Sequence, residues 1–169
     1  MQALYCLQCG TSLSQKFLHG RTRRYCPHCG WIHYINPLPV ALAVVMNSDN
    51  EILLVKRGEA PKVGKWCFPC GYMEGDEFPE TAALRELKEE TGLCGTINRF
   101  LTVIGSHSEL TPGQNVVIQA YYITVNDFSL LKAGDDAQDA AFFPITDYPA
   151  LAFEAHTEIL RTFKKILQI

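Results

Sequence analysis

Between residue 40 and the end of the chain, hydrophobic residues fall into short runs separated by turn-forming residues. Segments 40–46 and 52–55 are expected to be buried strands, and the polar turn 47–50 between them predicts a hairpin. Segment 66–68 is expected to be a short strand that ends at Pro69. Three further segments have the composition of strands, namely 97–104, 116–125 and 140–143.

Two segments have the features of helices. Pro79 opens the first, which runs to about Thr91, and Gly92 follows it, as expected just past a helix end. The second covers residues 154–169, where apolar residues form one stripe: Ile159, Leu160, Phe163, Ile166 and Leu167. Apolar runs combined with two helices are typical of a packed α/β core.

The first part of the chain has a different pattern and ends in Asn36-Pro37-Leu38-Pro39. Two prolines this close stop regular structure and favour an extended linker. We therefore expect two domains, residues 1–37 and 38–169.

Composition excludes several classes of protein. Hydrophobic residues make up 47% of the chain and charged residues 20%, which is typical of a globular and not a disordered protein. No apolar run is long enough to span a membrane, and no basic start followed by an apolar stretch indicates a signal peptide. We expect a cytoplasmic protein without a membrane partner.

Charge is divided unevenly along the chain. Residues 1–39 contain four basic residues and no acidic one, whereas the rest contains the other 11 basic residues and all 18 acidic ones. A basic module followed by an acidic one suggests two units with different roles. The four cations are equally consistent with binding to phosphates and with simple solvation of a small domain.

Four of the seven cysteines form two C-x-x-C pairs sixteen residues apart: Cys6, Cys9, Cys26 and Cys29. Each pair lets two thiolates reach one ion from a tight turn, and Gly10 and Gly30 follow the pairs where the backbone must turn. Four thiolates predict a closed, structural Zn²⁺ site. A segment of fewer than 40 residues needs such a site, because it buries too little apolar surface to fold alone.

The remaining cysteines carry weaker signals. Cys67 and Cys70 form a third C-x-x-C, but residues three apart in a strand point to opposite faces and would not share an ion. Cys94 is expected to be a core residue.

Three carboxylates share one face of the helix 79–91. Glu86 and Glu90 are one turn apart, and Glu89 lies between them around the circumference. Arg85, four residues before Glu89, is placed to pair with it. Crowded carboxylates repel unless a cation lies among them, and hard oxygen ligands suit Mg²⁺ or Mn²⁺. For the helix alone, a solvated charged face is an equally good interpretation.

The segment around this helix decides between the two interpretations. Residues 71–93, GYMEGDEFPETAALRELKEETGL, match the Nudix box at every specified position: Gly71, Glu77, Arg85, Glu86, Leu87, Glu89, Glu90, Gly92 and Leu93. The Asn-Pro before the first strand, the ILLVKR strand, the Gly-Lys-Trp before the box and the late PALAF stretch are also similar to Nudix members with an N-terminal four-cysteine zinc ribbon. The resemblance covers nearly the whole chain.

The resemblance implies a fold and a set of roles. The fold would be α/β, a Nudix α/β/α sandwich with a mixed sheet, preceded by a small zinc-ribbon β domain. The catalytic metals, Mg²⁺ or Mn²⁺, would be held by Glu86, Glu89, Glu90 and the main-chain oxygen of Cys70. Arg85 would orient Glu89, and Glu77 would cap and brace the loop.

The resemblance also implies a further acid from a late loop. Asp135, Asp136 and Asp139 are candidates, and Asp136 is preferred for its distance before Phe142-Phe143. The metals would lower the pKa of a bound water, and a carboxylate would take its proton.

The expected function is that of a Nudix pyrophosphohydrolase, which acts on a phosphorus-containing anhydride. The expected substrate is a small ADP-containing nucleotide, FAD or ADP-ribose, cut to AMP and a phosphate ester. The Ser-Gln-Pro-Trp signature of NADH pyrophosphatases is absent from residues 93–125, and Gly113-Gln114-Asn115-Val116 is more similar to FAD and ADP-ribose hydrolases. An NADH pyrophosphatase remains the alternative within the class.

A second alternative is an RNA-directed Nudix protein, cap-removing or RNA-binding, with the zinc ribbon as a recruitment module. We expect instead no nucleic-acid partner and a homodimer, with the ribbon shaping the substrate site or the dimer interface. The aromatic residues of the ribbon are then expected to pack it, and not to stack on a base: Tyr25, Trp31, His33 and Tyr34.

Overall fold

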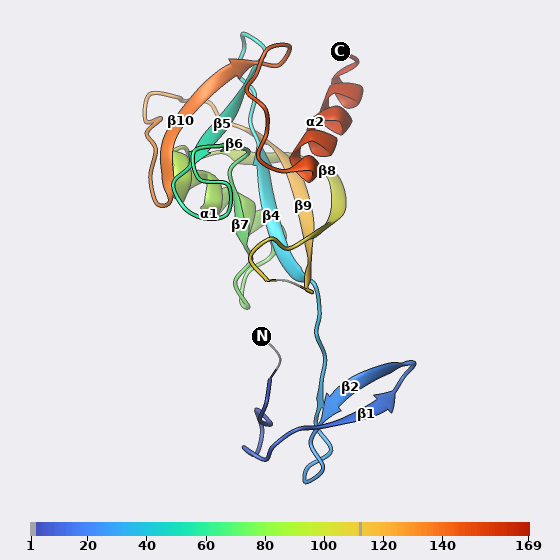
Figure 1. Cartoon of the computed structure of the whole chain (residues 1–169). Helices are drawn as coiled ribbons and strands as arrows, with labels where there is room; N and C mark the ends of the chain where they lie inside the picture. Colours follow the sequence, from blue (N-terminus) through green and yellow to red (C-terminus); the bar gives the residue numbers. More distant parts are fainter. Residues whose placement is uncertain (1–2, 112) are drawn as a thin grey trace. The chain divides into compact units, whose positions relative to one another are not determined.

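The computed structural model describes residues 3–111 and 113–169, which form two compact units (Figure 1). The boundary between the units falls between Pro37 and Leu38. Within the described residues, no helix is long and apolar enough to cross a membrane.

The N-terminal unit contains one antiparallel sheet with the strand order β1-β2-β3. Its strands are β1 (Ser14–Leu18), β2 (Arg21–Tyr25) and β3 (Ile32–His33). His19 and Gly20, both at positive φ, form the turn between β1 and β2. Cys6 and Cys26 are the buried residues among those described in this unit. The centre of the unit therefore consists of cysteine side chains and not of an apolar core.

The C-terminal unit contains two sheets. The first has the order β7-β4-β9-β8, formed by β4 (Leu38–Val44), β7 (Cys70–Tyr72), β8 (Thr96–His107) and β9 (Asn115–Thr124). The second has the order β10-β5-β6, formed by β5 (Glu51–Arg57), β6 (Trp66–Cys67) and β10 (Ala137–Pro144). The first sheet is mixed, because β4 pairs with β9 in parallel while its other pairs are antiparallel.

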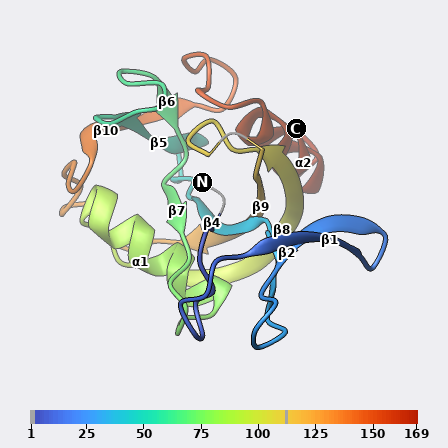
Figure 2. The same ribbon diagram turned by 60° about the horizontal axis from the view of Figure 1, so that its bottom comes forward.

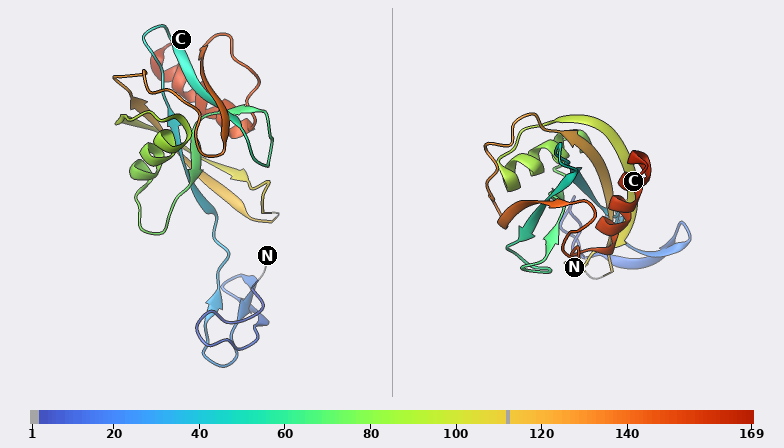
Figure 3. Two further views of the ribbon diagram at one scale, coloured as in Figure 1. Left: turned by 90° about the vertical axis from the view of Figure 1, so that its left-hand side faces the viewer. Right: turned by 90° about the horizontal axis from the view of Figure 1, so that it is seen from above.

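The two helices pack on opposite faces of β4 (Figures 1 and 3). They are α1 (Pro79–Thr91) and α2 (Glu154–Leu167). Successive side chains of β4 and the residue just after it alternate between two core clusters: Val40, Leu42 and Val44 pack with α2, and Ala41, Ala43 and Val45 pack with α1. Burial of both faces explains the continuous apolar run at this strand. The expected α/β class and mixed sheet are confirmed.

The expected hairpin between segments 40–46 and 52–55 is wrong as a strand pairing. Asn47 does form the turn, because its side-chain oxygen accepts hydrogen bonds from the backbone N–H groups of Asp49 and Glu51. However, β4 and β5 belong to different sheets and are joined by an isolated bridge between Met46 and Ile52. The reason is that β7 and β9 occupy both edges of β4.

Helix α1 has the predicted limits. Pro79 lies in its first turn, and Gly92 ends it at φ 71° with its N–H donating to the Lys88 carbonyl. Positive φ is unfavourable for a residue with a Cβ, so glycine is suited to this end. Figure 2 shows α1 beside β7, the short strand that the sequence did not reveal.

Candidate active site and metal sites

Burial of α1 fixes the direction of its carboxylates. Ala83 and Leu87 are fully buried against β4, which anchors the helix. Glu86 and Glu90 are 7% and 4% exposed, so these two carboxylates lie inside the protein. The side chain of Glu89 is 45% exposed at the edge of the same face.

Arg85 connects the acidic residues of the site. Its Nη1 donates to Glu86 at 2.6 Å and to Glu89 at 2.9 Å. Its Nη2 and Nε donate to the two carboxylate oxygens of Glu77 at 2.6 and 3.1 Å, and Nη2 also donates to the Tyr72 carbonyl. The Glu77 carboxylate, followed by Glu86 and Glu89, raises the pKa of Arg85 above its ordinary value. Arg85 therefore holds three carboxylates in place with a permanent positive charge.

Glu77 connects this network to the loop before α1. Its Oε1 accepts a hydrogen bond from the Glu74 backbone N–H at 2.9 Å. Hydrogen bonds from Arg85 and then from Glu74 lower the pKa of Glu77, so the carboxylate stays charged. These contacts correspond to the loop-bracing role that the resemblance implied for Glu77.

Glu90 is the most deeply buried of the carboxylates and has little positive charge near it. The Cys70 backbone N–H donates to its Oε2 at 3.2 Å. Burial, then the negative charges of Cys67, Asp136 and Glu86, raise the pKa of Glu90 to about 9. A buried carboxylate beside other anions is costly unless a cation compensates it. The residues therefore fit a hard divalent cation with oxygen ligands.

Gly71 is required by the closeness of the Glu86 carboxylate. A Cβ at Gly71 would lie 2.2 to 2.5 Å from the carboxylate atoms of Glu86. Glycine at this box position thus leaves space for the buried acid between β7 and α1.

The loop that leads into β10 and contains Gly134, Asp135 and Asp136 packs on the C-terminal end of α1. The Gly134 backbone N–H donates to the Glu90 carbonyl at 3.1 Å, and a Cβ at Gly134 would lie 2.5 Å from the Glu89 carbonyl oxygen. The Asp136 carbonyl in turn accepts the Gly58 N–H at 2.6 Å. These contacts hold the loop close to the carboxylates.

The three candidate late-loop acids differ in their surroundings. The negative charge of Asp136 adds to burial in raising the pKa of Glu90, and burial, with a smaller contribution from the charge of Asp135, raises the pKa of Glu86. Asp139 is exposed, and its carboxylate accepts a hydrogen bond from the neighbouring Ala140 N–H. Asp136 also lines the adjacent cavity, as Asp135 and Asp139 do not.

A cavity of about 250 Å³ adjoins these carboxylates. One side consists of Cys70, Gly71 and Asp136, which contact or surround the buried acids. The other side comes from segments outside the box: residues 59–61, residues 106–110 and the start of α2. Lys62, directly after the first of these segments, forms a 3.3 Å ion pair with Glu109 of the second. No motif in the sequence predicted this second side of the cavity.

His156 is a buried residue of the cavity lining that the sequence did not reveal. The Phe68 backbone N–H donates to its Nδ1 at 3.2 Å, which places the ring proton on Nε2. Burial, together with the charge of Arg57, lowers the pKa of His156 to about 3, so the ring is neutral. Its Nε2 lies 3.9 Å from the Cys70 sulfur.

The third C-x-x-C crosses between the two sheets. Cys67 ends β6 and Cys70 begins β7, so the pair does not lie in one strand. A hydrogen bond from the Cys70 thiol is the main cause that lowers the pKa of Cys67. Among the described residues, these thiols are not part of a metal-binding cluster. The expectation for Cys94 is wrong, because Cys94 is exposed and its neighbour Leu93 fills the core.

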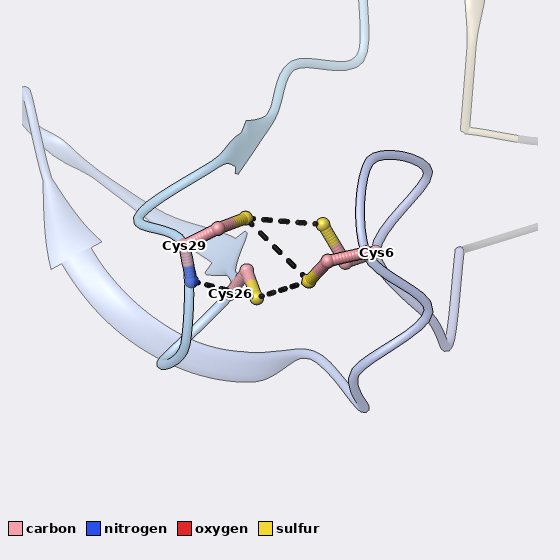
Figure 4. A group of neighbouring side chains, drawn as sticks. Cys6, Cys26 and Cys29 are labelled. Carbon is pink, nitrogen blue, oxygen red and sulfur yellow. Dashed lines mark hydrogen bonds between the residues drawn. The ribbon is translucent and has the colours of Figure 1, made fainter.

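The sulfur atoms of the four N-terminal cysteines converge on one point, and Figure 4 labels three of these residues, Cys6, Cys26 and Cys29. The sulfur of Cys6 lies 3.5 Å from that of Cys29, and the sulfur of Cys9 lies 3.5 Å from Cys26 and 3.6 Å from Cys29. Zn–S bonds of about 2.3 Å in a tetrahedron imply sulfur separations of about 3.8 Å. The cluster is therefore arranged to bind a metal ion.

The two cysteine pairs occupy equivalent turns. Gly10 and Gly30, at φ 72° and 77°, donate their N–H groups to the carbonyls of Cys6 and Cys26. Positive φ favours glycine, which agrees with the expected role of both residues.

The aromatic residues of the N-terminal unit contact its own cations and rings. The Arg23 guanidinium lies 4.7 Å from the centre of the Tyr34 ring, and the Lys16 amine lies 5.6 Å from that of Tyr25. The Trp31 and His33 rings are 5.6 Å apart. These contacts contribute to packing within a unit that has little other core.

Two protein-family models match this chain. The NUDIX domain model matches residues 36–163. The chain belongs to the Nudix family. The Nudix N-terminal zinc-ribbon model matches residues 4–35, which contain all four converging cysteines. Both parts of the expected resemblance are confirmed.

Proteins similar in sequence to this chain include enzymes that are named as hydrolases or pyrophosphatases. An ADP-ribose pyrophosphatase from Methanocaldococcus jannaschii is 38% identical over 132 residues, covering 78% of this chain and 76% of the relative. The NAD-capped RNA hydrolase NudC from Vibrio atlanticus is 28% identical over 148 residues. The match covers 88% of this chain but only 52% of that relative.

Solved structures agree with the fold. A Nudix hydrolase from Nitrosomonas europaea is 27% identical, with a TM-score of 0.83, and the match covers 99% of this chain and 93% of that one. The Nudix domain of NrtR from Shewanella oneidensis, solved with ADP-ribose, is 22% identical, with a TM-score of 0.68 over 85% of this chain and 94% of that one. The chain is a Nudix hydrolase with the expected α/β fold and zinc-ribbon region, and enzymes of this family use divalent metals.

Proposed function

We propose that this Nudix hydrolase cuts the diphosphate bond of a small ADP-containing nucleotide, ADP-ribose or FAD, to AMP and a second phosphate ester. The observation that carries the proposal is the cluster of Glu86, Glu89 and Glu90 beside a cavity of about 250 Å³. The ADP-ribose pyrophosphatase that is 38% identical supports the choice of substrate.

The carboxylates of Glu86, Glu89 and Glu90, with the main-chain oxygen of Cys70, would hold Mg²⁺ or Mn²⁺. When bound, such ions neutralise the diphosphate and lower the pKa of a coordinated water. Arg85 keeps Glu86 and Glu89 oriented through its 2.6 and 2.9 Å hydrogen bonds. The acids are thus fixed before substrate arrives, which limits reorganisation during the reaction.

Asp136 is the proposed proton acceptor. It lies at the cavity wall, close enough to Glu90 for its charge to raise that group's pKa. In the proposed step, water attacks one phosphorus and its proton passes to the Asp136 carboxylate. The bridging P–O bond breaks, and the second phosphate ester leaves with the bridging oxygen. No covalent intermediate with the protein is needed.

Zn²⁺ is the proposed ion of the N-terminal unit. Four thiolates complete a tetrahedral shell and leave no position for a substrate, so the role is structural. We also propose that the ribbon shapes the substrate site or a homodimer interface and is not a nucleic-acid reader. Only residues 34–37 separate β3 from β4, whereas a tethered reader would usually need a longer flexible linker.

Two alternatives differ in substrate. In the first, the substrate is NADH, and the same hydrolysis of a diphosphate bond takes place. A capped RNA is the other alternative, favoured by the similarity to NudC and by the four basic residues of the N-terminal unit.

A hydrolysis screen with Mg²⁺ or Mn²⁺ tests these possibilities. The compounds are ADP-ribose, FAD, NADH, NAD, diadenosine polyphosphates and capped RNA, with AMP and other products separated by chromatography. The proposal expects the highest kcat/KM for ADP-ribose or FAD. A higher value for capped RNA or NADH would reject it in favour of the corresponding alternative.

A further inference from the structure

The cavity has a side that the proposed chemistry does not use. The carboxylates need only the wall at Cys70, Gly71 and Asp136. The remaining wall contains an arginine and a phenylalanine, Arg57 at the end of β5 and Phe153 just before α2. Whatever part of a nucleotide extends beyond its diphosphate would contact these side chains.

Two of the three nitrogen atoms of the Arg57 guanidinium donate to backbone carbonyls. Its Nε donates to the Pro61 carbonyl at 2.6 Å, and its Nη2 lies 3.4 and 3.5 Å from the carbonyls of Glu59 and Ala60. These bonds direct Nε and Nη2 toward the loop backbone and leave Nη1 as the remaining donor nitrogen of the guanidinium. Its flat faces remain suited to stacking.

One of those faces lies over Phe153. The Arg57 guanidinium carbon is 5.4 Å from the centre of the Phe153 ring. The ring also contacts His156, at 5.1 Å between centres, and His156 is in turn held by the Phe68 N–H. Phe153 is therefore supported from two sides, and the pair is ordered before a ligand binds.

We propose that Arg57 and Phe153 form a stacking platform for the adenine ring of the substrate. This inference rests on the proposed function, because it places the base of the ADP moiety. A planar aromatic ring fits the pair better than a sugar does, since the guanidinium already lies over the Phe153 ring and both groups offer flat surfaces for stacking. Ser106 and Ser108, on the same cavity wall, are suited to the polar edge of the base or to ribose hydroxyls.

The affinities of the protein for AMP and for ribose 5-phosphate test the platform separately from hydrolysis. AMP and ribose 5-phosphate differ by the base alone, and neither contains a diphosphate bond. Isothermal titration of the full chain with each compound in the presence of Mg²⁺ is expected to give at least tenfold tighter binding of AMP. This ratio corresponds to stacking of about one base on an aromatic side chain.

The Phe153→Leu variant is expected to lose this preference. AMP should bind about tenfold more weakly, while the affinity for ribose 5-phosphate stays constant. Phe100→Leu is the matched control, because Phe100 is an exposed aromatic residue of β8 that does not line the cavity. That variant should keep the preference for AMP.

Two results would overturn the platform. One is unchanged AMP affinity in Phe153→Leu, and the other is equal weakening of both compounds, which would indicate a purely structural role. Arg57→Lys keeps the charge but not the flat guanidinium, and it should also weaken AMP selectively. If the protein binds AMP through the platform but hydrolyses no ADP derivative, the proposed function fails and the platform stands.

Discussion

Gly71 and Glu86 are in direct contact: a side chain of even one carbon on Gly71 would overlap the Glu86 carboxylate. The Gly71→Ala variant should therefore displace the carboxylate from its place beside Arg85. Because the displaced group is the end of a side chain, we expect the fold to survive while kcat falls about a hundredfold. Activity assays and thermal unfolding of the same preparation check this, and full activity in the variant would contradict the placement of Glu86.

Glu90→Gln should remove most of the activity without unfolding the protein. The amide keeps the shape of the side chain but loses the charge that the proposed metal requires, so kcat should fall by about three orders of magnitude or more. Glu80→Gln, an exposed position on the same helix, is the control and should be close to wild type. Near-normal turnover of Glu90→Gln would reject the metal-site assignment.

One tightly bound zinc per chain is expected in protein purified without added metal. Cys26→Ser should lose this zinc, because Cys26 is a buried member of the four-cysteine cluster. Cys67→Ser and Cys70→Ser should retain it. Elemental analysis distinguishes these cases, and the opposite pattern would move the zinc to the third cysteine pair.

Removal of residues 1–36 tests the role proposed for the ribbon. We expect slower hydrolysis of a small dinucleotide or loss of the dimer, measured by steady-state kinetics and by light scattering. RNA affinity is measured in parallel. If kinetics and mass per particle were unchanged but RNA binding disappeared, the ribbon would be a recruitment module.

His156 should make the protein less stable in mild acid. The folded state holds the pKa of His156 at about 3, against an ordinary value of 6.5, so between these values only the unfolded chain gains the proton. The stabilising contribution is complete above pH 6.5 and is lost as the pH falls, by about 1.4 kcal/mol per pH unit. Urea unfolding between pH 7 and pH 5 measures this slope.

His156→Gln is the matched variant for that measurement. Glutamine keeps an acceptor for the Phe68 N–H but does not titrate, so on acidification the variant should lose about 1.4 kcal/mol less stability per pH unit than wild type. An identical slope in both proteins would show that other groups are responsible.

The sequence predicted α1 and its acids well because that information is local. The spacing of Glu86, Glu89 and Glu90 places them on one face, and Pro79 and Gly92 mark the limits that the structure shows. The cysteine pairs were equally informative, since their spacing alone implies convergence. Neither prediction required knowledge of distant contacts.

Long-range pairing could not be predicted in the same way. The apolar pattern of β4 indicates a buried strand but does not reveal that β9, whose paired residues lie 78 positions later, is its parallel partner. For this reason the turn at Asn47 suggested a hairpin that the sheets do not form. The second side of the cavity was missed for the same reason, because Arg57 and Phe153 meet only in the folded chain.

One wall of the cavity lies beside the carboxylates of α1, and the opposite wall comes from residues 59–61, residues 106–110 and the start of α2. This arrangement affects how substrate specificity can change during evolution. The acids are anchored by a helix packed in the core, where most changes would damage the whole protein. The opposite wall comes largely from connecting segments, which accept substitutions and insertions more readily. Substrate specificity can therefore change during evolution while the catalytic carboxylates are retained. Related chains can then share one reaction and differ in their substrates.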